Sequence, residues 1–117
     1  MAHFQNLLVC QKSKELVILI YNLIKHFPVE ERYGICDQLR RAVISVPSNI
    51  AEGMGRLTDK DQAHFINVAY ASLMEVLAQT DISKDLKYIN NEEYLQVEEL
   101  VEEISRMLSS LRAKRTP

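Results

Sequence analysis

Residues Gln38–Arg56 read QLRRAVISVPSNIAEGMGR and contain a proline, Pro47, within a run that has helical apolar spacing. A proline inside a helix removes one backbone hydrogen bond and costs about 3 kcal/mol. The run is therefore either broken near Ser45, with Pro47 at the first position of a new helix, or continuous and kinked at Pro47. We favour the kinked continuous helix, because Val46 would be a poor N-terminal cap for a new one.

Apolar residues at spacings of three and four predict four helices. The first row of predicted core positions is Val9, Ser13, Leu16, Ile20, Leu23 and Phe27. The next three rows are Ile35, Leu39, Ala42, Val43, Val46 and Ile50; Ile66, Ala69, Tyr70, Leu73, Leu77 and Thr80; and Tyr94, Val97, Val101, Ile104, Leu108 and Leu111. The signals that separate the helices are Pro28, Gly53 with Gly55, a Thr58 cap, and a cap at Asn90 or Asn91. Short joints favour antiparallel neighbours. The sequence thus predicts an all-α, up-down-up-down four-helix bundle, a single domain over residues 1–117, whose second helix starts near Val29.

Composition is that of a soluble globular protein, with 47% apolar residues and a formal net charge of −2. Cys10 and Cys36 lack metal-like spacing and are expected to be buried thiols of a reducing compartment. The longest apolar run, from Leu16 to Tyr21, is far shorter than the ~20 residues of a membrane span. The chain opens Met-Ala-His-Phe-Gln, with no charged leader followed by an apolar stretch, so we expect no signal peptide. We therefore expect a cytoplasmic protein with no membrane partner.

The polar residues around Pro47 predict a structural polar network made of Gln38, Ser45, Asn49 and Glu52. Because Pro47 removes the donor for the Val43 carbonyl, a side chain or water must replace it, and Ser45, Ser48 and Asn49 are the candidates. Glu52 would be a buried charge paired with Arg41 or Arg56, whose loss costs a few kcal/mol. The alternative is a ligand site at the same residues.

Signals for catalysis are weak. Gly53-Met54-Gly55 has neither a preceding strand nor the further residues of a nucleotide-binding loop. Asp61 and His64 form a single Asp-x-x-His pair, whereas a di-iron bundle site needs two such pairs and further carboxylates. We predict no enzyme activity, no catalytic residue, no cofactor and no metal site.

Basic residues provide the candidate nucleic-acid contacts, which are Arg40, Arg41, Arg56, Arg112, Lys114 and Arg115. Such groups neutralise phosphates. The alternative is that Arg40 and Arg41 pair with carboxylates such as Asp37. The net charge of −2 argues against strong indiscriminate binding of RNA or DNA. The acidic run from Glu92 to Glu103 is either a solvated face or a surface that meets the basic ends of a neighbouring copy.

Surplus apolar residues lie beside the core rows of the first and last helices: Leu8, Ile18, Leu19, Ile24, Leu95, Leu100 and Met107. A bundle helix in a monomer keeps one polar face. Surplus apolar surface marks an interface, unless these residues only broaden the core. We expect self-association.

The chain resembles the bacterial proteins named after the intervening sequences of 23S ribosomal RNA genes. The resemblance covers nearly the whole chain and includes Phe4-x-x-Leu7, Glu15-Leu16, Tyr21, Phe27-Pro28 and Glu31. Its most specific part is Gln38-x-x-Arg41-Ala42 … Ser45-x-Pro47-x-Asn49-Ile50-Ala51-Glu52-Gly53 and Arg56, followed by Phe65 … Ala69 … Ser72-x-x-Glu75.

The resemblance implies a small bundle that assembles as a homopentamer and has no enzymatic activity. A related branch, the accessory protein of diversity-generating retroelements, is a basic pentameric barrel that binds nucleic acid and a reverse transcriptase. This chain departs from that branch in being mildly acidic, and Ala71 stands where the family usually has glycine. We expect a non-enzymatic homo-oligomer that associates with RNA or DNA. The alternative is a scaffold that binds another protein and no nucleic acid.

Overall fold

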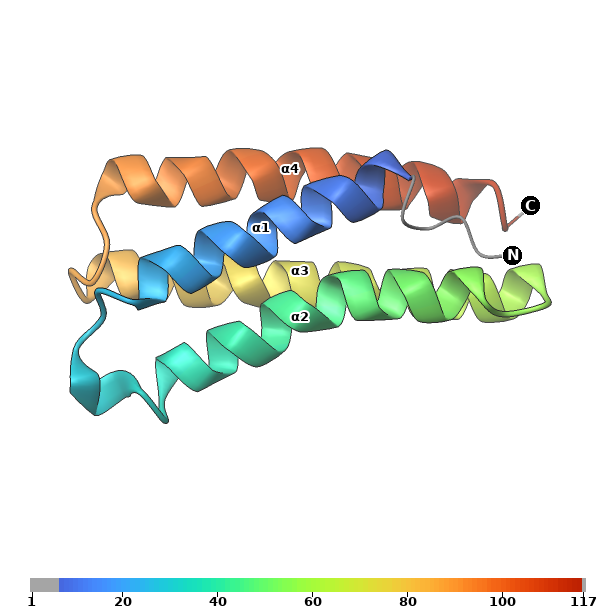
Figure 1. The fold of residues 1–117 in the computed structure, drawn as a ribbon. Helices are drawn as coiled ribbons and strands as arrows, with labels where there is room; N and C mark the ends of the chain where they lie inside the picture. Colours follow the sequence, from blue (N-terminus) through green and yellow to red (C-terminus); the bar gives the residue numbers. More distant parts are fainter. Residues whose placement is uncertain (1–6, 117) are drawn as a thin grey trace.

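A computed structural model of the chain describes residues 7–116. Within this range the elements are four α-helices and one 3-10 helix, with no strand: α1 (Leu8–Ile24), η2 (Val29–Glu31), α2 (Ile35–Met54), α3 (Asp59–Asp85) and α4 (Asn91–Ala113). The helices alternate in direction, each packs on the next, and α4 packs on α1 (Figure 1). This arrangement confirms the predicted all-α four-helix bundle.

The core is formed by the predicted apolar rows, with a few exchanges. Tyr70 was expected in the core but is 37% exposed, and Val76 is fully buried on the same helix. Ile24, expected to be surplus, is also buried. Both errors come from helices whose apolar residues occupy more than one face, so that spacing alone does not identify the inner one. No helix among the described residues combines the length and apolarity needed to cross a membrane.

The start of the second helix was predicted wrongly. Residues Val29–Glu31 form η2, and α2 begins only at Ile35. Gly34 separates the two with φ −101° and ψ −116°, a backbone conformation outside the helical region. Glu31 Oε1 accepts a hydrogen bond from the Ile35 backbone N–H at 3.5 Å. This bond satisfies one of the backbone N–H groups in the first turn of α2, which have no partner within the helix.

The α2 helix runs unbroken through Pro47 to Met54, as predicted. In Figure 1 the first part of α2 runs obliquely and its later part runs level, but a kink located at Pro47 itself stays a prediction. Gly53 lies inside the helix rather than ending it, and Gly55 is the C-cap. A Cβ on Gly53 would lie 3.1 Å from Cβ of Phe65, so this glycine allows α2 and α3 to pack closely.

The last two helices have the predicted N-terminal caps. The Thr58 hydroxyl oxygen accepts a hydrogen bond from the Asp61 backbone N–H at 3.1 Å. Asn90 and Glu93 form a capping box, in which each side chain accepts the other residue's backbone N–H. These caps fix where α3 and α4 begin, and hence how their far ends align with the rest of the bundle.

The turn after α3 contains Lys87 with φ 68°, in the left-handed region that favours glycine. The Tyr88 backbone N–H donates to the Ser83 carbonyl and that of Lys87 to the Lys84 carbonyl, both at 2.9 Å, which closes the helix end. We expect Lys87→Gly to raise the free energy of unfolding by about 1 kcal/mol, because glycine lacks the Cβ penalty here. Chemical denaturation measures this change.

Lys14→Gly is the matched control, because Lys14 is an exposed lysine within α1. Glycine there should lower the free energy of unfolding by about 1 kcal/mol. A loss of stability in both variants would contradict the assigned role of the Lys87 backbone.

Candidate nucleic-acid interface

The fold separates the six predicted basic contacts into two groups. Arg40 and Arg41 lie in the first half of α2, near the connection from α1. The other four lie where α2 and α4 end, at the opposite end of the bundle, which also holds the start of α3 (Figure 1). We call the second group, Arg56, Arg112, Lys114 and Arg115, the basic end. The six residues therefore do not form one surface on a single copy of the chain.

In the basic end, two arginines are held by neutral partners. Arg112 Nη1 donates to Asn67 Oδ1 at 3.0 Å. Arg115 Nε donates to Gln62 Oε1 at 2.7 Å, and its Nη1 donates to the Leu111 carbonyl at 2.8 Å. Amide and carbonyl oxygens orient a guanidinium without cancelling its charge. Both positive charges therefore remain available to an anion.

Arg56 differs from these two because a carboxylate compensates its charge. Its Nη2 lies 2.8 Å from Glu52 Oε2, and the guanidinium lies 4.6 Å from the centroid of the Phe65 ring. Gln62 Nε2 donates to the Arg56 carbonyl at 2.8 Å, so Gln62 contacts both Arg56 and Arg115. This amide ties the end of α2 to the tail that follows α4.

The charge balance of the residues that the structure describes at this end of the bundle is positive. Lys114 is exposed and has no ion pair within the described residues. Among the described residues, the carboxylates of this end are Glu52, Asp59 and Asp61. They are outnumbered by its cations, Arg56, Lys60, Arg112, Lys114 and Arg115. The surplus lies on the residues after Leu111.

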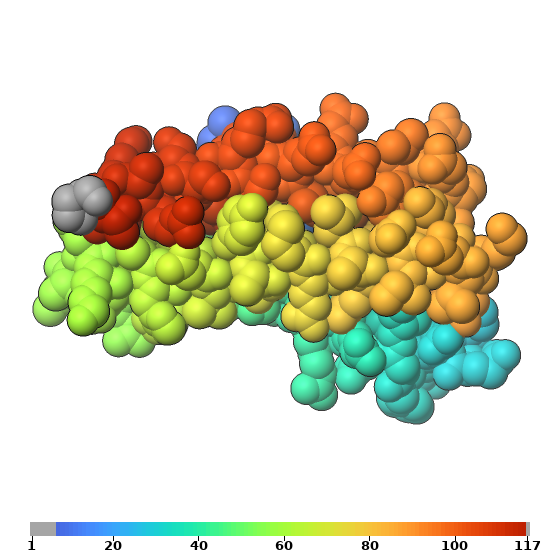
Figure 2. Space-filling model, turned by 180° about the vertical axis from the view of Figure 1, so that it is seen from behind, coloured from blue at the N-terminus to red at the C-terminus, as the bar shows by residue number. Residues whose placement is uncertain are grey.

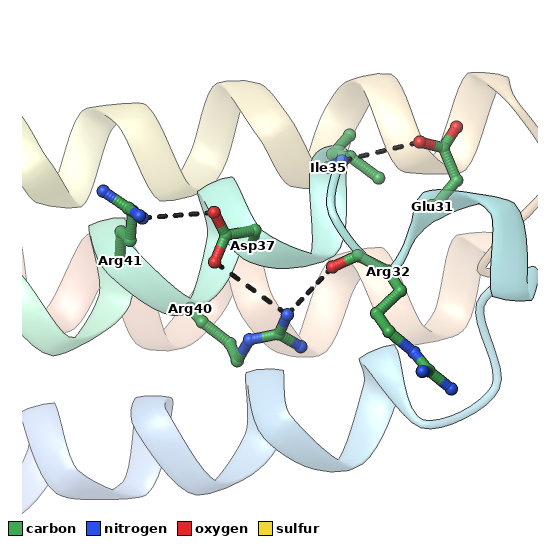
Figure 3. A network of polar contacts seen from close by, with 6 residues as sticks. All are labelled: Glu31, Arg32, Ile35, Asp37, Arg40 and Arg41. Atoms are coloured by element: carbon green, nitrogen blue, oxygen red, sulfur yellow. Dashed lines mark hydrogen bonds and ion pairs between the residues drawn. The ribbon is translucent and has the colours of Figure 1, made fainter.

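Arg40 and Arg41 share one carboxylate, as the alternative interpretation expected (Figure 3). Arg41 Nε lies 3.2 Å from Asp37 Oδ2, and Arg40 Nη2 lies 4.0 Å from Asp37 Oδ1. Arg40 Nη2 also donates to the Arg32 carbonyl at 2.9 Å. The Arg41 side chain is 81% exposed. Asp37 thus compensates Arg41 more closely than Arg40.

Three of the predicted polar residues, Gln38, Ser45 and Asn49, lie along the contact between α2 and α3 but do not form one network. Ser45 and Ser72 approach to 2.8 Å between their hydroxyl oxygens, and Asn49 Nδ2 lies 2.8 Å from both the Ser45 carbonyl and its hydroxyl. Gln38 Oε1 accepts separately from Gln79 Nε2 at 3.3 Å. The Asn49 amide therefore serves the Ser45 carbonyl, not that of Val43 as one prediction had it.

The expectation that Glu52 is a buried charge is wrong. Its side chain is 52% exposed, and its partner is Arg56, one of the two that were predicted. Glu52 lies on the solvent side of the last turn of α2, whereas Asn49 and Gly53 face α3. The large stability cost expected for losing Glu52 therefore does not apply, since exposed ion pairs contribute about 0–1 kcal/mol.

Two features escaped the prediction from sequence. The first is a row of apolar residues along the outer face of α3, at spacings of four, which we call the α3 ridge: Tyr70, Met74, Ala78, Ile82 and Leu86. Ile82 is 51% and Leu86 49% exposed, and Figure 2 shows this face of α3 uncovered between α4 and α2. The second is that Lys25 and Arg32 join Arg40 at one hollow. A count of apolar residues in every fourth position of α3 would have found the ridge.

The predicted surplus on α1 and α4 is found only in part. Leu8, Ile18 and Leu95 are 56%, 61% and 48% exposed. Leu19, Leu100 and Met107 pack partly against the core, and Ile24 belongs to it. Exposed apolar surface is thus present, but it lies more on α3 than the sequence suggested.

Comparison with known proteins identifies the family. The sequence model of the 23S rRNA-intervening sequence proteins matches residues 5–110. The chain belongs to this family. A solved structure of a protein of unknown function from the S23 ribosomal protein family of Bacteroides thetaiotaomicron VPI-5482 is similar, with a TM-score of 0.82 and 26% identity over 90% of this chain and 98% of that one. None of the curated proteins compared with the chain matches it.

The contacts between α2 and α3 give a direct test of the polar residues. We expect Ser45→Ala to lower the free energy of unfolding by about 1–2 kcal/mol, because Ser72 and Asn49 are both deprived of a partly buried partner. Glu52→Ala, at an exposed position two turns away, should cost less than about 1 kcal/mol. Denaturant titration of both variants measures the two losses in the free energy of unfolding. A larger loss for Glu52→Ala than for Ser45→Ala would refute the prediction.

Proposed function

We propose that this member of the 23S rRNA-intervening sequence protein family is a non-enzymatic homo-oligomer, a homopentamer, that binds RNA or DNA. The observation that carries nucleic-acid binding is the basic end, where Arg112, Lys114 and Arg115 have no carboxylate within ion-pair distance among the described residues. Arginine and lysine in this state release counterions when they meet phosphates, which favours binding.

Further support comes from the geometry of these groups. Arg112 and Arg115 are anchored through one or two of their nitrogens to Asn67, Gln62 and Leu111, and the remaining N–H groups are left to bind a ligand. Arginine donors held in a fixed plane match the two oxygens of a phosphate. Arg41, which is highly exposed, is a further candidate at the other end of the bundle, together with Arg40.

Self-association is supported by the α3 ridge. Its residues follow the i+4 row that packs into the groove of a facing helix. From Tyr70 to Leu86 this row is about 24 Å long at 1.5 Å per residue. Tyr70, Ile82 and Leu86 of this row are exposed in the single chain, whereas Met74 packs partly against the core. A second copy offers an apolar surface that would cover the exposed members. A ring of copies also repeats the basic end and multiplies its phosphate contacts.

Nucleic-acid binding is tested by fluorescence anisotropy of labelled RNA and DNA oligonucleotides over a range of salt concentrations. We expect affinity to fall steeply with salt. The triple variant Arg112→Gln, Lys114→Gln, Arg115→Gln should reduce the slope of log K against log salt by about one for each phosphate that it no longer neutralises. Because the slope reports the number of neutralised phosphates, it separates removal of the site from damage to the fold.

The single variants Lys14→Gln and Arg106→Gln are the matched controls, because they remove exposed cations elsewhere on α1 and α4. Each should leave the slope almost unchanged. If the unaltered protein fails to bind either oligonucleotide at low salt, nucleic-acid association is wrong and the protein-binding scaffold is the better interpretation.

Self-association is tested by sedimentation velocity. We expect the unaltered protein to sediment as a complex of about five chains of 13.5 kDa. Ile82→Glu places a charge in the middle of the α3 ridge and should shift the distribution to smaller species, because burying an unpaired charge at an interface is costly. Helical circular dichroism should stay at the parent level, since Ile82 is half exposed.

Gln11→Glu adds the same charge at an exposed position of α1 and should leave the complex intact. A single-chain species for the unaltered protein at micromolar concentration would refute self-association. A complex that tolerates Ile82→Glu would refute the α3 ridge as its interface.

A further inference from the structure

A small hollow lies where α1 ends and the chain passes through η2 into α2. Ile24, Phe27 and Cys36 provide apolar lining, and Lys25, Arg32 and Arg40 provide three cations. Its volume is about 230 Å³. We call it the basic pocket. It lies at the end of the bundle opposite to the basic end (Figure 1).

The charges that line the basic pocket all have one sign, because no carboxylate is among its lining residues in the described part of the chain. Two other hollows on the described surface carry charges of both signs. Lys12 and Arg106 share theirs with Glu99 and Glu103, and a hollow beside the turn after α3 combines two lysines with two carboxylates. The basic pocket therefore differs from an ordinary charged groove, in which each cation meets an acid.

Arg40 is held in place at this pocket. Its Nη2 donates to the Arg32 carbonyl at 2.9 Å, which fixes the guanidinium between η2 and α2. Asp37 is its nearest carboxylate at 4.0 Å, and Arg41 lies closer to that carboxylate at 3.2 Å. The charge of Arg40 is thus oriented by a neutral carbonyl and only weakly offset by an acid.

Lys25 and Arg32 have no ion pair within residues 7–116. Both lie at the surface, so they are free to close over a ligand. In Figure 3 the guanidinium of Arg32 points toward the side of α1 and away from Glu31. The guanidinium of Arg40 also lies on the side of α1, where a dashed line joins it to Asp37. Two unpaired cations and one anchored cation therefore face the same hollow.

The carboxylate of Glu31 opposes an anion here, but its hydrogen bonds hold it toward partners that do not line the pocket. Glu31 Oε2 accepts the hydroxyl of Tyr88 at 2.7 Å, and its Oε1 accepts the Ile35 backbone N–H. Burial raises the pKa of the Cys36 thiol, against an opposite effect of Arg40, so the pocket wall stays neutral. The carbonyls at the end of α1 repel an anion, and Lys25, as the C-cap of α1, lies where it offsets them.

We propose that the basic pocket binds a phosphate group. Arg40 and Arg32 supply planar guanidinium donors that match two phosphate oxygens, and Lys25 supplies a third positive charge. The phosphate is either a free or terminal one, or part of a nucleic-acid backbone. The site does not depend on the nucleic-acid binding proposed above, because inorganic phosphate alone tests it.

The test is a titration of isotope-labelled protein with inorganic phosphate at constant ionic strength, followed by amide NMR shifts. We expect saturable shifts centred on residues 24–40. Arg32→Gln and Lys25→Gln should each weaken the affinity by about tenfold, since each removes one charge-assisted contact. Neither side chain has a described contact through its charged group, so neither change is expected to unfold the protein.

Arg106→Gln is the matched control, because it removes an arginine from a hollow that also holds carboxylates. It should leave the affinity for phosphate unchanged. The absence of saturable shifts, or an equal response in all three variants, would overturn the proposal. Saturable phosphate shifts without oligonucleotide binding would support the basic pocket and refute the proposed nucleic-acid binding. Oligonucleotide binding without phosphate shifts would support nucleic-acid binding and refute the basic pocket.

Competition then identifies the source of the phosphate. An oligonucleotide with a 5′-phosphate and the same sequence with a 5′-hydroxyl are each added to the phosphate-bound protein. Displacement by the first alone assigns a terminal phosphate, and displacement by both assigns the backbone. Displacement by neither assigns the free ion. Each of these results retains the phosphate site.

Discussion

The close packing of α2 against α3 is the constraint on which the rest of the structure depends. Gln38 meets Gln79, Ser45 meets Ser72, and Gly53 meets Phe65. These contacts recur about every two helical turns, and the position on α3 moves back as that on α2 advances, as antiparallel helices require. A shift of one helical turn would separate all three pairs. The register also places the end of α2 beside Gln62, which connects it to Arg115.

The contact between α2 and α3, which we call the seam, also shows what the sequence signature of the family encodes. The stretch that carries the resemblance, from Gln38 to Gly53 and from Phe65 to Glu75, supplies both sides of the seam. Small side chains and a glycine bring the helices together, and the hydroxyl and amide groups satisfy one another. The signature therefore identifies a way of packing two helices. It says little about a ligand, because most of its residues are buried or half-buried rather than exposed.

Periodicity and caps were enough to predict the four helices, because long rows such as Val97, Val101, Ile104 and Leu108 bury every member. They were not enough on α3, which is apolar on two faces, so Tyr70 was assigned to the wrong one. Residues that depend on a turn also escaped. Gly34 has a non-helical backbone and separates η2 from α2. The connection through η2 and Gly34 brings Lys25 and Arg32 close to Arg40. No sequence spacing encodes such a meeting, since it depends on how η2 folds back between two helices.

The net charge of −2 is a poor guide to whether this protein binds anions. The molecule is 44 Å long, whereas charges are screened beyond about 10 Å at 0.1 M salt. The exposed carboxylates of α4, such as Glu99 and Glu102, therefore act little on either basic region. The electrostatic potential at each end of the bundle is set by the charges of that end. An anion that approaches Arg115 meets a positive charge that its neutral amide partner does not cancel. The sum over the chain averages regions that do not interact, so local compensation decides what each end attracts.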